Sequence, residues 1–392
     1  MKKYRIIFHI DLNAFYASCE EAHDPSLKNQ PIGIGGKTDR GILTTANYAA
    51  RKYGVKSAMS VKEAKMLCPK LKVLPANFEL YKHYSNLFFE YLNTWTDLIE
   101  PASIDEGYLD MTEVIKDKHP VKLAEEMRDY LLNHYDLPVS IGIAPNMFLA
   151  KMASDMKKPL GITVLRKDDV KEKLWPLPIE EMHGIGKKTV PNLKLLGIET
   201  IEDLATYKNR EKLSKFLGNS TESFIQKANG VHERLVDPTR SETIQSIGNS
   251  KTYEGYLHEY QEMIQALDRL TKKVVGRLKD RSLAAKTITV QMRTSDYKNT
   301  SKNFSFSYHT NDYYEIFTEV ERLFDDLFTE GSVHLLGVSS SNLKQSEDQF
   351  RQLNIFDVKQ GSKKDEHISS VLSEINKHYK KPLLKRGLND ND

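Results

Sequence analysis

Three acidic residues stand at the ends of largely apolar segments. Asp11 directly follows residues 4–10, and Asp105 and Glu106 lie together between two further short apolar stretches. An unpaired buried carboxylate is costly, so acids in such places need an explanation. They could be paired with basic residues or exposed in turns. If instead they meet at one edge of a sheet, they form a hard-oxygen site that suits Mg²⁺.

The chemistry of such a site would be phosphoryl transfer. Two magnesium ions about 4 Å apart can stabilise both the attacking and the leaving oxygen of an in-line displacement. The sequence offers no Ser-His-Asp or Cys-His set that competes with these acids. We therefore predict a magnesium site formed by Asp11, Asp105 and Glu106.

The elements that would position these acids follow from hydrophobic periodicity. Residues 4–10 read as a buried strand that leads into Asp11, and residues 99–111 read as a strand–turn–strand unit around Asp105 and Glu106. Residues 138–144 alternate as another strand. Helical spacing is found in the ranges 14–22, 46–52, 61–67, 81–99, 122–134 and 148–157.

The sequence changes in character after Leu165. Residues 166–230 consist of short helical patterns interrupted by glycines, which predicts a small all-helical domain, and residues 237–242 read as a linker. The next predicted elements are a strand at 245–253, a helix at 257–280, strands at 286–294 and 302–310, a helix at 312–329 and a strand at 333–342. This β-α-β-β-α-β order predicts one four-stranded sheet with two helices.

Composition is that of a globular protein. The 392 residues are 39% hydrophobic and 28% charged, and length alone suggests two to four domains. No apolar run is long enough for a membrane helix, and the N-terminus lacks the features of a signal peptide, so we expect a cytoplasmic protein. Cys19 and Cys68 are too few for a disulfide framework or a zinc site.

Charge is unevenly distributed although the net charge is only +3. The stretch 269–302 carries ten Lys and Arg against two acids, whereas the stretch 312–330 carries seven acids and one Arg. Nucleic acid is the natural partner for the basic stretch. The alternative is a pair of solvated helix faces.

Four longer segments resemble the motifs of Y-family DNA polymerases. Residues 9–20 (HIDLNAFYASCE) and 103–110 (SIDEGYLD) are similar to the two palm motifs that hold acids, and residues 45–55 (TANYAARKYGV) to the fingers motif. Residues 141–144 (IGIA) with 149–159 (LAKMASDMKKP) are similar to the last motif. The resemblance covers roughly residues 4–342, with the motifs in the family's order.

The resemblance implies an α+β multidomain fold shaped like a right hand. The palm would comprise residues 1–12 and 74–165, the fingers 13–73, and a thumb with a helix-hairpin-helix 166–235. A linker at 236–243 would lead to a little finger at 244–343 that grips DNA, with its acidic helix facing away from the DNA. Residues 344–392 would form a disordered tail.

The resemblance also implies roles for the acids and their neighbours. Asp11, Asp105 and Glu106 would bind two Mg²⁺ ions, with the Leu12 carbonyl as a further ligand. Asp11 and Asp105 would bridge both ions, and Glu106 would face the primer 3′-hydroxyl. Tyr16 matches the steric gate that excludes the 2′-hydroxyl of a ribonucleotide, and Phe15 would support it. Without the motif, these two rings would read as core packing.

A nucleotide-binding set is implied by the fingers motif. Thr45, Tyr48 and Arg51 recur at spacings of three, which predicts one face of a helix that clamps a triphosphate. The alternative is an exposed helix stripe. Lys158 would add a point charge on the same phosphates, and Lys157 is its rival for that role.

Two further segments point to macromolecular partners. Residues 182–198 resemble a helix-hairpin-helix in which Gly184, Gly186 and Lys187 would contact the DNA backbone. In the polar tail, Gln352, Leu353, Ile355 and Phe356 belong to a pentapeptide that resembles the one by which bacterial replication proteins dock onto the sliding clamp.

The predicted function is template-directed, error-prone DNA synthesis on damaged templates. The substrates would be primer-template DNA and deoxynucleoside triphosphates, and the chain would act as a monomer. One alternative is a nucleotidyl cyclase, because a palm-type sheet with paired acids also supports that reaction. The other is a catalytically inactive scaffold that binds DNA or the clamp.

Overall fold

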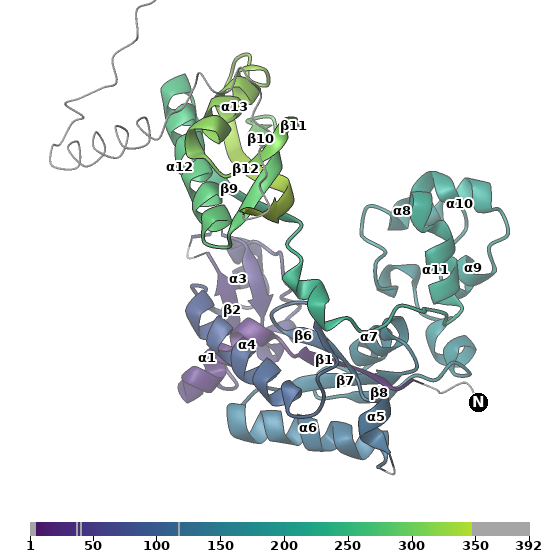
Figure 1. Cartoon of the computed structure of the whole chain (residues 1–392). Helices are drawn as coiled ribbons and strands as arrows, with labels where there is room; N and C mark the ends of the chain where they lie inside the picture. The colour runs from purple at the N-terminus through teal and green to yellow at the C-terminus, as the bar shows by residue number, and fades with distance from the viewer. Residues whose placement is uncertain (1–4, 37, 40, 117, 347–392) are drawn as a thin grey trace, which may run out of the picture. The chain divides into compact units, whose positions relative to one another are not determined.

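The computed structural model describes residues 5–36, 38–39, 41–116 and 118–346. The chain divides into two compact units, Met1–Thr243 and Ile244–Asp392, and each is described by itself (Figure 1). Within the described ranges, no helix is long and apolar enough to cross a membrane.

A five-stranded sheet forms the centre of the first unit. Its order is β5-β6-β1-β7-β8, and only the β7–β8 pair is parallel. The strands are β1 (Ile7–Leu12), β5 (Ile99–Pro101), β6 (Glu106–Asp110), β7 (Val139–Ala144) and β8 (Ile162–Val164). The strands predicted at 4–10, 99–111 and 138–144 are therefore confirmed as neighbours, whereas β8 was not predicted.

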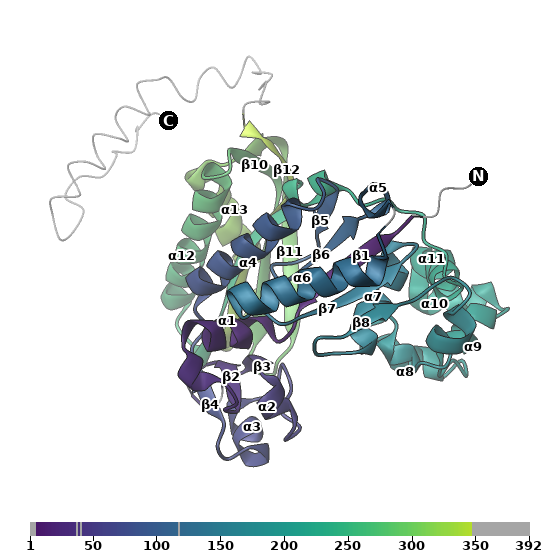
Figure 2. The same cartoon turned by 90° about the horizontal axis from the view of Figure 1, so that it is seen from below.

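The two faces of this sheet pack against different helices. In β1, Phe8, Ile10 and Leu12 join a core with α4 (Phe78–Asn93) and α6 (Pro120–Tyr135). Because side chains alternate along a strand, His9 and Asp11 face the other side, where α7 (Met147–Met156) covers the sheet (Figure 2). The apolar alternation of β1 thus directs its acid towards α7.

Helix α4 corrects one predicted boundary. We expected a helix over residues 81–99, but it begins at Phe78, after Asn77 accepts a hydrogen bond from the Leu80 amide, and it ends at Asn93. This part of the chain also contains the helices α1 (Phe15–His23) and α5 (Thr112–Ile115) and the 3-10 turn η1 (Pro25–Leu27).

Residues 32–74 contain a small sheet that the sequence did not predict. Its order is β3-β2-β4, formed by β2 (Ile32–Gly35), β3 (Leu43–Ala46) and β4 (Lys72–Leu74). The short helices α2 (Tyr48–Arg51) and α3 (Val61–Leu67) confirm the helical patterns expected there. Val55, Val61 and Cys68 belong to the core that this segment forms by itself.

Residues 170–228 form the expected cluster of short helices. The elements are the π-helical turn η2 (Val170–Leu174), the 3-10 turns η3 (Ile179–Glu181) and η4 (Gly218–Ser220), and the helices α8 (Val190–Lys194), α9 (Ile201–Thr206), α10 (Arg210–Leu217) and α11 (Thr221–Ala228). A capping box between Thr200 and Asp203 fixes the start of α9. The turn η5 (Pro238–Glu242) ends the unit.

The second unit has the predicted β-α-β-β-α-β order. Its elements are β9 (Ser246–Leu257), α12 (Tyr260–Lys279), β10 (Leu283–Thr294), β11 (Asn299–Thr310), α13 (Tyr313–Asp325) and β12 (Val333–Gln345), and the strand order is β11-β10-β12-β9. Both helices pack on the sheet face that carries Ile288, Val290 and Leu336.

Small and polar side chains occupy the other face of this sheet. The register places there Thr287, Thr289, Gln291 and Arg293 of β10, Ser301, Asn303 and Ser305 of β11, Ser339 and Ser341 of β12, and Ser246 and Ser250 of β9. Among the described residues of this unit, no helix covers that face. We call it the hydroxyl face.

Candidate active site

Strand pairing brings the three predicted acids together. Asp11 on β1 is paired with Glu106 on β6, and the Leu12 amide donates a hydrogen bond of 2.9 Å to the carbonyl of Asp105. Paired residues of antiparallel strands point to the same face, so Asp11 and Glu106 both face α7. Acids that are almost one hundred residues apart in sequence thus meet at one end of the sheet.

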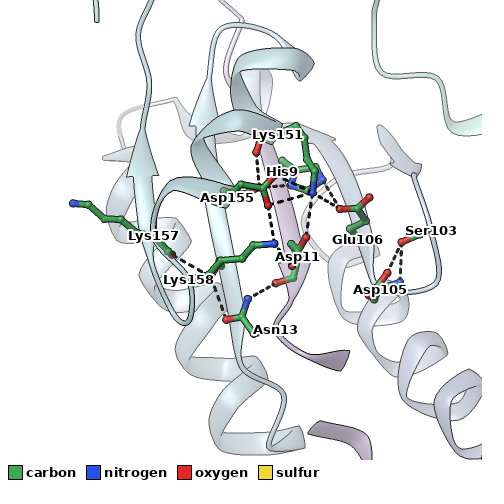
Figure 3. Close-up of polar contacts among 12 residues, drawn as sticks. His9, Asp11, Asn13, Ser103, Asp105, Glu106, Lys151, Asp155, Lys157 and Lys158 are labelled. Atoms are coloured by element: carbon green, nitrogen blue, oxygen red, sulfur yellow. Dashed lines mark hydrogen bonds and ion pairs between the residues drawn. The ribbon is translucent and has the colours of Figure 1, made fainter. Parts of the chain in front are cut away.

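Two lysines also reach the acids: Lys151, which the sequence analysis did not name, and Lys158, which it predicted as a phosphate-binding residue (Figure 3). Lys151 Nζ of α7 lies 2.7 Å from Glu106 Oε2 and 3.3 Å from Asp11 Oδ2. Lys158 Nζ lies 2.7 Å from Asp11 Oδ1, and Asp155 contacts both ammonium groups, at 3.4 Å from Lys151 and 2.8 Å from Lys158. Their sequence spacing of four and three residues is a helical-face signal that could have revealed this trio.

Close packing of α7 on the sheet is what brings Lys151 within reach. A Cβ atom on Gly142 of β7 would lie 2.0 Å from the Ala150 carbonyl oxygen and 2.5 Å from the Ser154 amide nitrogen. Because glycine has no Cβ, the helix can lie directly on the strand. Gly142 therefore sets the distance between the lysine-bearing helix and the acids.

The acids and lysines strongly influence one another's charge. Burial, and then repulsion from Asp11 and Glu106, raises the pKa of Asp105. Burial opposes ionisation of Glu106 too, but its contacts with His9 and Lys151 outweigh burial and lower its pKa. Burial would lower the pKa of Lys151, but the attraction of the surrounding carboxylates outweighs burial and raises it.

A buried histidine makes polar contacts next to the cluster of acids and lysines. His9 is fully buried, and its Nδ1 is hydrogen-bonded to Ser154 Oγ at 2.8 Å, while its Nε2 lies 3.3 Å from Glu106 Oε2. Burial lowers the pKa of His9, which favours the neutral ring. The Ser154 hydroxyl also donates a hydrogen bond to the Lys151 carbonyl. The sequence analysis missed this contact because it joins two elements.

Basic and polar groups engage the side chains of the predicted cation ligands. Among the described residues, no three His, Cys, Asp or Glu side chains are grouped so that they could hold a metal ion as they stand. The reason is that ammonium groups engage Asp11 and Glu106, while Asp105 turns to the hydroxyl of Ser103. The predicted convergence is thus correct for the backbone, and the oxygens themselves are paired with lysines.

The chemistry of the donors nevertheless fits divalent cations. Four carboxylates, those of Asp11, Asp105, Glu106 and Asp155, accompany two ammonium groups, so four negative charges less two positive charges leaves an excess of two negative charges. Carboxylate oxygens are the preferred ligands of Mg²⁺. The two ammonium groups occupy places that favour positive charge.

The predicted gate residues lie on α1 next to this cluster. Phe15 is buried, and Tyr16 is partly exposed. The Tyr16 ring stacks on Tyr81 with centroids 4.4 Å apart, and Phe78 meets it edge-on. The Tyr81 hydroxyl donates a hydrogen bond of 2.7 Å to Glu20, which fixes the supporting ring.

The predicted phosphate clamp is only partly on a helix. Tyr48 and Arg51 lie on α2, where the Arg51 guanidinium is 4.7 Å from the Tyr48 ring centroid. Thr45 instead lies in β3, so the expectation of one helical face for all three residues is wrong. Asn47 separates the strand from the helix, because its side chain caps the helix by accepting from the Ala50 amide.

The structure distinguishes the two candidate phosphate-binding lysines. Lys158 points into the acid cluster, whereas Lys157 is exposed and points away from it (Figure 3). Both residues directly follow the end of α7. Lys158 is therefore the lysine that shares a site with Asp11.

The predicted DNA-contacting residues lie on an exposed turn before α8. Gly184, Gly186 and Lys187 are all exposed, and Gly184 has a φ of 96°, a conformation that favours glycine. The clamp peptide with Gln352, Leu353, Ile355 and Phe356 lies outside the described residues. Cys19 and Cys68 are buried free thiols, as expected.

The basic stretch 269–302 is divided among three elements of the second unit. It runs along α12 and then through β10 into β11, and some of its lysines are paired with acids. Lys272 contacts Asp268 at 2.9 Å, and Lys302 contacts Asp326 at 2.8 Å. The basic and acidic stretches therefore neutralise each other in part.

Comparisons with known proteins agree with this architecture. The impB/mucB/samB family matches residues 10–155, the C-terminal domain of that family matches residues 244–355, and the family's HHH motif matches residues 167–198. The chain is 43% identical to DNA polymerase IV of Bacillus velezensis and 42% identical to DNA polymerase IV 1 of Bacillus subtilis, each over 98% of this chain and 93% of the relative.

A solved structure shows the same fold. A Y-family DNA polymerase chimera superimposes with a TM-score of 0.78 at 28% identity, covering 86% of this chain and 98% of that chain. The fold expected from the sequence motifs, a right hand of palm, fingers and thumb with a little finger, is thereby confirmed. Acids paired across β1 and β6, the matched family models and the related sequences all lead to one assignment: this chain belongs to the Y family of DNA polymerases.

Proposed function

We propose that this chain extends a primer 3′-hydroxyl with deoxynucleotides under the direction of a DNA template, including damaged templates. The observation that carries the proposal is the register that sets Asp11 and Glu106 side by side, with Asp105 adjoining, at the end of a sheet. This arrangement occurs in a chain that is similar over most of its length to proteins named DNA polymerase IV.

Asp11, Asp105, Glu106 and the Leu12 carbonyl would hold two Mg²⁺ ions. When bound, the ions would supply charge stabilisation to the attacking and leaving oxygens of phosphoryl transfer. The chain's own contribution is to fix the donors. Hydrogen bonds along β1 and β6 fix the backbone, and the pairing of Glu106 with Lys151 and His9 keeps that carboxylate ionised.

The fingers residues would hold the incoming nucleotide. Tyr48 and Arg51 present a phenol and a guanidinium from one short helix, and Thr45 adds a hydroxyl from the preceding strand. Lys158 would reach the triphosphate from the acid cluster. Tyr16 would exclude ribonucleotides by contact with a 2′-hydroxyl, because its stacking on Tyr81 prevents the ring from moving aside.

DNA would be held through its backbone. The glycine turn with Gly184, Gly186 and Lys187 offers exposed amides and a positive charge. The hydroxyl face of the second unit offers many hydrogen-bonding groups and few bulky side chains, which suits contacts to phosphate and sugar independent of sequence. Residues 352–356 would dock a monomeric polymerase onto the sliding clamp.

Primer extension with Mg²⁺ and deoxynucleotides tests the proposal. Asp105→Ala should reduce template-directed extension by about three orders of magnitude, since it removes a cation ligand, while DNA binding measured by anisotropy persists. Asp129→Ala is the matched control, because Asp129 is an exposed carboxylate on α6 that pairs with Arg128. Extension by the Asp105 variant at the control's rate would contradict the assignment, and activity independent of template would favour the cyclase.

The proposed role of Tyr16 in excluding ribonucleotides is tested separately. Tyr16→Ala should allow ribonucleotide incorporation, seen as a fall of about a hundredfold in the ratio of kcat/KM for deoxy- over ribonucleotides, because the clash is worth a few kcal/mol. Tyr84→Ala, on the neighbouring helix α4, provides an aromatic control. Unchanged sugar selectivity in the Tyr16 variant would remove the gate from that residue.

A further inference from the structure

Both carboxylate oxygens of Asp11 are engaged by lysines. Its Oδ2 faces Lys151 Nζ at 3.3 Å, and its Oδ1 faces Lys158 Nζ at 2.7 Å (Figure 3). Each oxygen therefore already has a cationic partner. A divalent cation that approaches Asp11 therefore competes with these ammonium groups, whose positive charge opposes its binding.

The two lysines differ in how firmly they are held. Lys151 lies within α7, its side chain is 10% exposed, and it contacts three carboxylates. Lys158 lies beyond the end of the helix, its side chain is 25% exposed, and it contacts only Asp11 and Asp155. Releasing Lys151 would leave a buried charge unpaired, whereas Lys158 can turn towards solvent.

Asp155 gives Lys158 a second anchor that does not belong to the predicted cation ligands. Asp155 is 42% exposed and lies 2.8 Å from Lys158 Nζ. When Asp11 turns to a divalent cation, Lys158 keeps one partner of modest strength, because exposed ion pairs are weak. The freed ammonium then stays beside the place where the triphosphate would bind.

We propose that Lys158 is an exchangeable counter-cation of Asp11, which a divalent cation displaces and thereby releases for the nucleotide phosphates, whereas Lys151 remains a fixed partner of the acids. This inference rests on the proposed function and deepens it. The exchange couples cation binding to phosphate binding. A phosphate group that draws the Lys158 ammonium away from Asp11 favours the cation there, and the bound cation favours the phosphate in return, because such coupling is reciprocal.

Mn²⁺ binding to the full chain, without DNA or nucleotide, tests the exchange. Free Mn²⁺ is measured by electron paramagnetic resonance during titration of wild type, Lys158→Met, Lys158→Gln and Lys157→Met. Both Lys158 variants should bind Mn²⁺ about tenfold more tightly than wild type, because the competing ammonium is gone. Lys157→Met removes the same charge one residue away and should change the affinity less than twofold.

The outcomes separate this inference from the proposed function. Equal Mn²⁺ affinity in the Lys158 and Lys157 variants would overturn the exchange, as would weaker binding in the Lys158 variants. Asp11→Asn should abolish the tight Mn²⁺ site in all backgrounds. If Asp11→Asn leaves Mn²⁺ binding intact, the cation site assigned under the proposed function fails, whatever the lysine variants show.

A second readout follows the ammonium itself. In NMR spectra of chains with ¹³C-dimethylated lysines, the signal lost in the Lys158→Met variant should shift when Mg²⁺ is added, and the signal lost in the Lys157→Met variant should not. A Lys158 signal that is unaffected by saturating Mg²⁺ would show that its ammonium does not leave Asp11.

Discussion

The five-stranded sheet of the first unit and the four-stranded sheet of the second differ in what they bury. In the first unit, His9, Glu100 and Lys151 are buried, and the strands around them are three to six residues long. In the second unit, among the described residues, the buried polar side chains are all hydroxyls, and the strands are twelve or thirteen residues long.

The difference suits the two tasks that we propose for these sheets. A site that stabilises developing charge needs ionised groups in a place with little water, and it keeps them there by pairing each with another. A surface that follows a sugar-phosphate backbone needs hydrogen-bonding groups that are exposed, on a scaffold that apolar packing holds together. The first unit therefore depends on electrostatic pairing, and the second on its hydrophobic core.

The largest expected effect is a difference in stability between two matched lysine substitutions, one in each unit. Lys151→Met should destabilise the first unit by about 3–5 kcal/mol, because it removes a buried ammonium group that neutralises the partly exposed carboxylates of Asp11 and Glu106. Lys302→Met in the second unit should cost at most about 1 kcal/mol, because the pair with Asp326 is exposed. Urea unfolding followed by a probe in each unit measures both. Equal losses would refute the contrast between the units.

Two substitutions that remove buried hydroxyl groups should have smaller effects on stability. The two effects should be opposite in sign to each other. Ser154→Ala should cost about 1–3 kcal/mol, because it leaves His9 Nδ1 without its hydrogen bond. Thr271→Val in α12 should stabilise the second unit by about 1 kcal/mol, because the Thr271 hydroxyl is buried without a hydrogen-bond partner. Thermal unfolding of both variants would show shifts in opposite directions, and shifts of the same sign would contradict this reading.

A further expected effect concerns acid sensitivity in the first unit. Burial, with Lys227, Arg234 and Arg5 nearby, lowers the pKa of His232 from its ordinary value of 6.5 to about 4. A group whose folded pKa is lowered in this way takes up its proton more readily when unfolded. Its stabilising contribution is therefore complete above pH 6.5 and is lost as the pH falls towards 4.

His232→Gln provides the check. The variant should lose less stability than wild type between pH 6.5 and 4, and the two should show parallel pH dependence above pH 7. Denaturant unfolding at a series of pH values measures this. If the two curves remain parallel throughout the acid range, His232 does not carry the effect.

Much of the fold was predictable because its patterns are local. The apolar run before Asp11, the alternation over 138–144 and the long elements of the second unit all show the period of their structure in sequence. The pairing of Asp11 with Glu106 followed from strands that could lie side by side, and the register shows that pairing.

The rest of the fold and of the site could not be predicted, because its elements are short or because its contacts join residues that are distant in sequence. Strand β2 is the four residues IGIG, too brief for a period of two to show, so the three-stranded sheet was missed. Thr45 lies before Asn47, whose side chain caps the start of α2. The spacing of three between Thr45 and Tyr48 therefore wrongly indicated a shared helical face. Lys151 could not be assigned to Glu106 because only the packing of α7 on β7 brings them together.

That packing gives Gly142 an influence that its own chemistry does not suggest. It bears no functional group and contacts no substrate, yet the hydrogen atom in place of a side chain determines how near the ammonium of Lys151 comes to the acids. Redesign of the site's electrostatic field could therefore begin at a residue that carries no charge at all. Exchanging that hydrogen for a methyl group would alter the field by displacing a helix, with every ionisable residue left unchanged in kind.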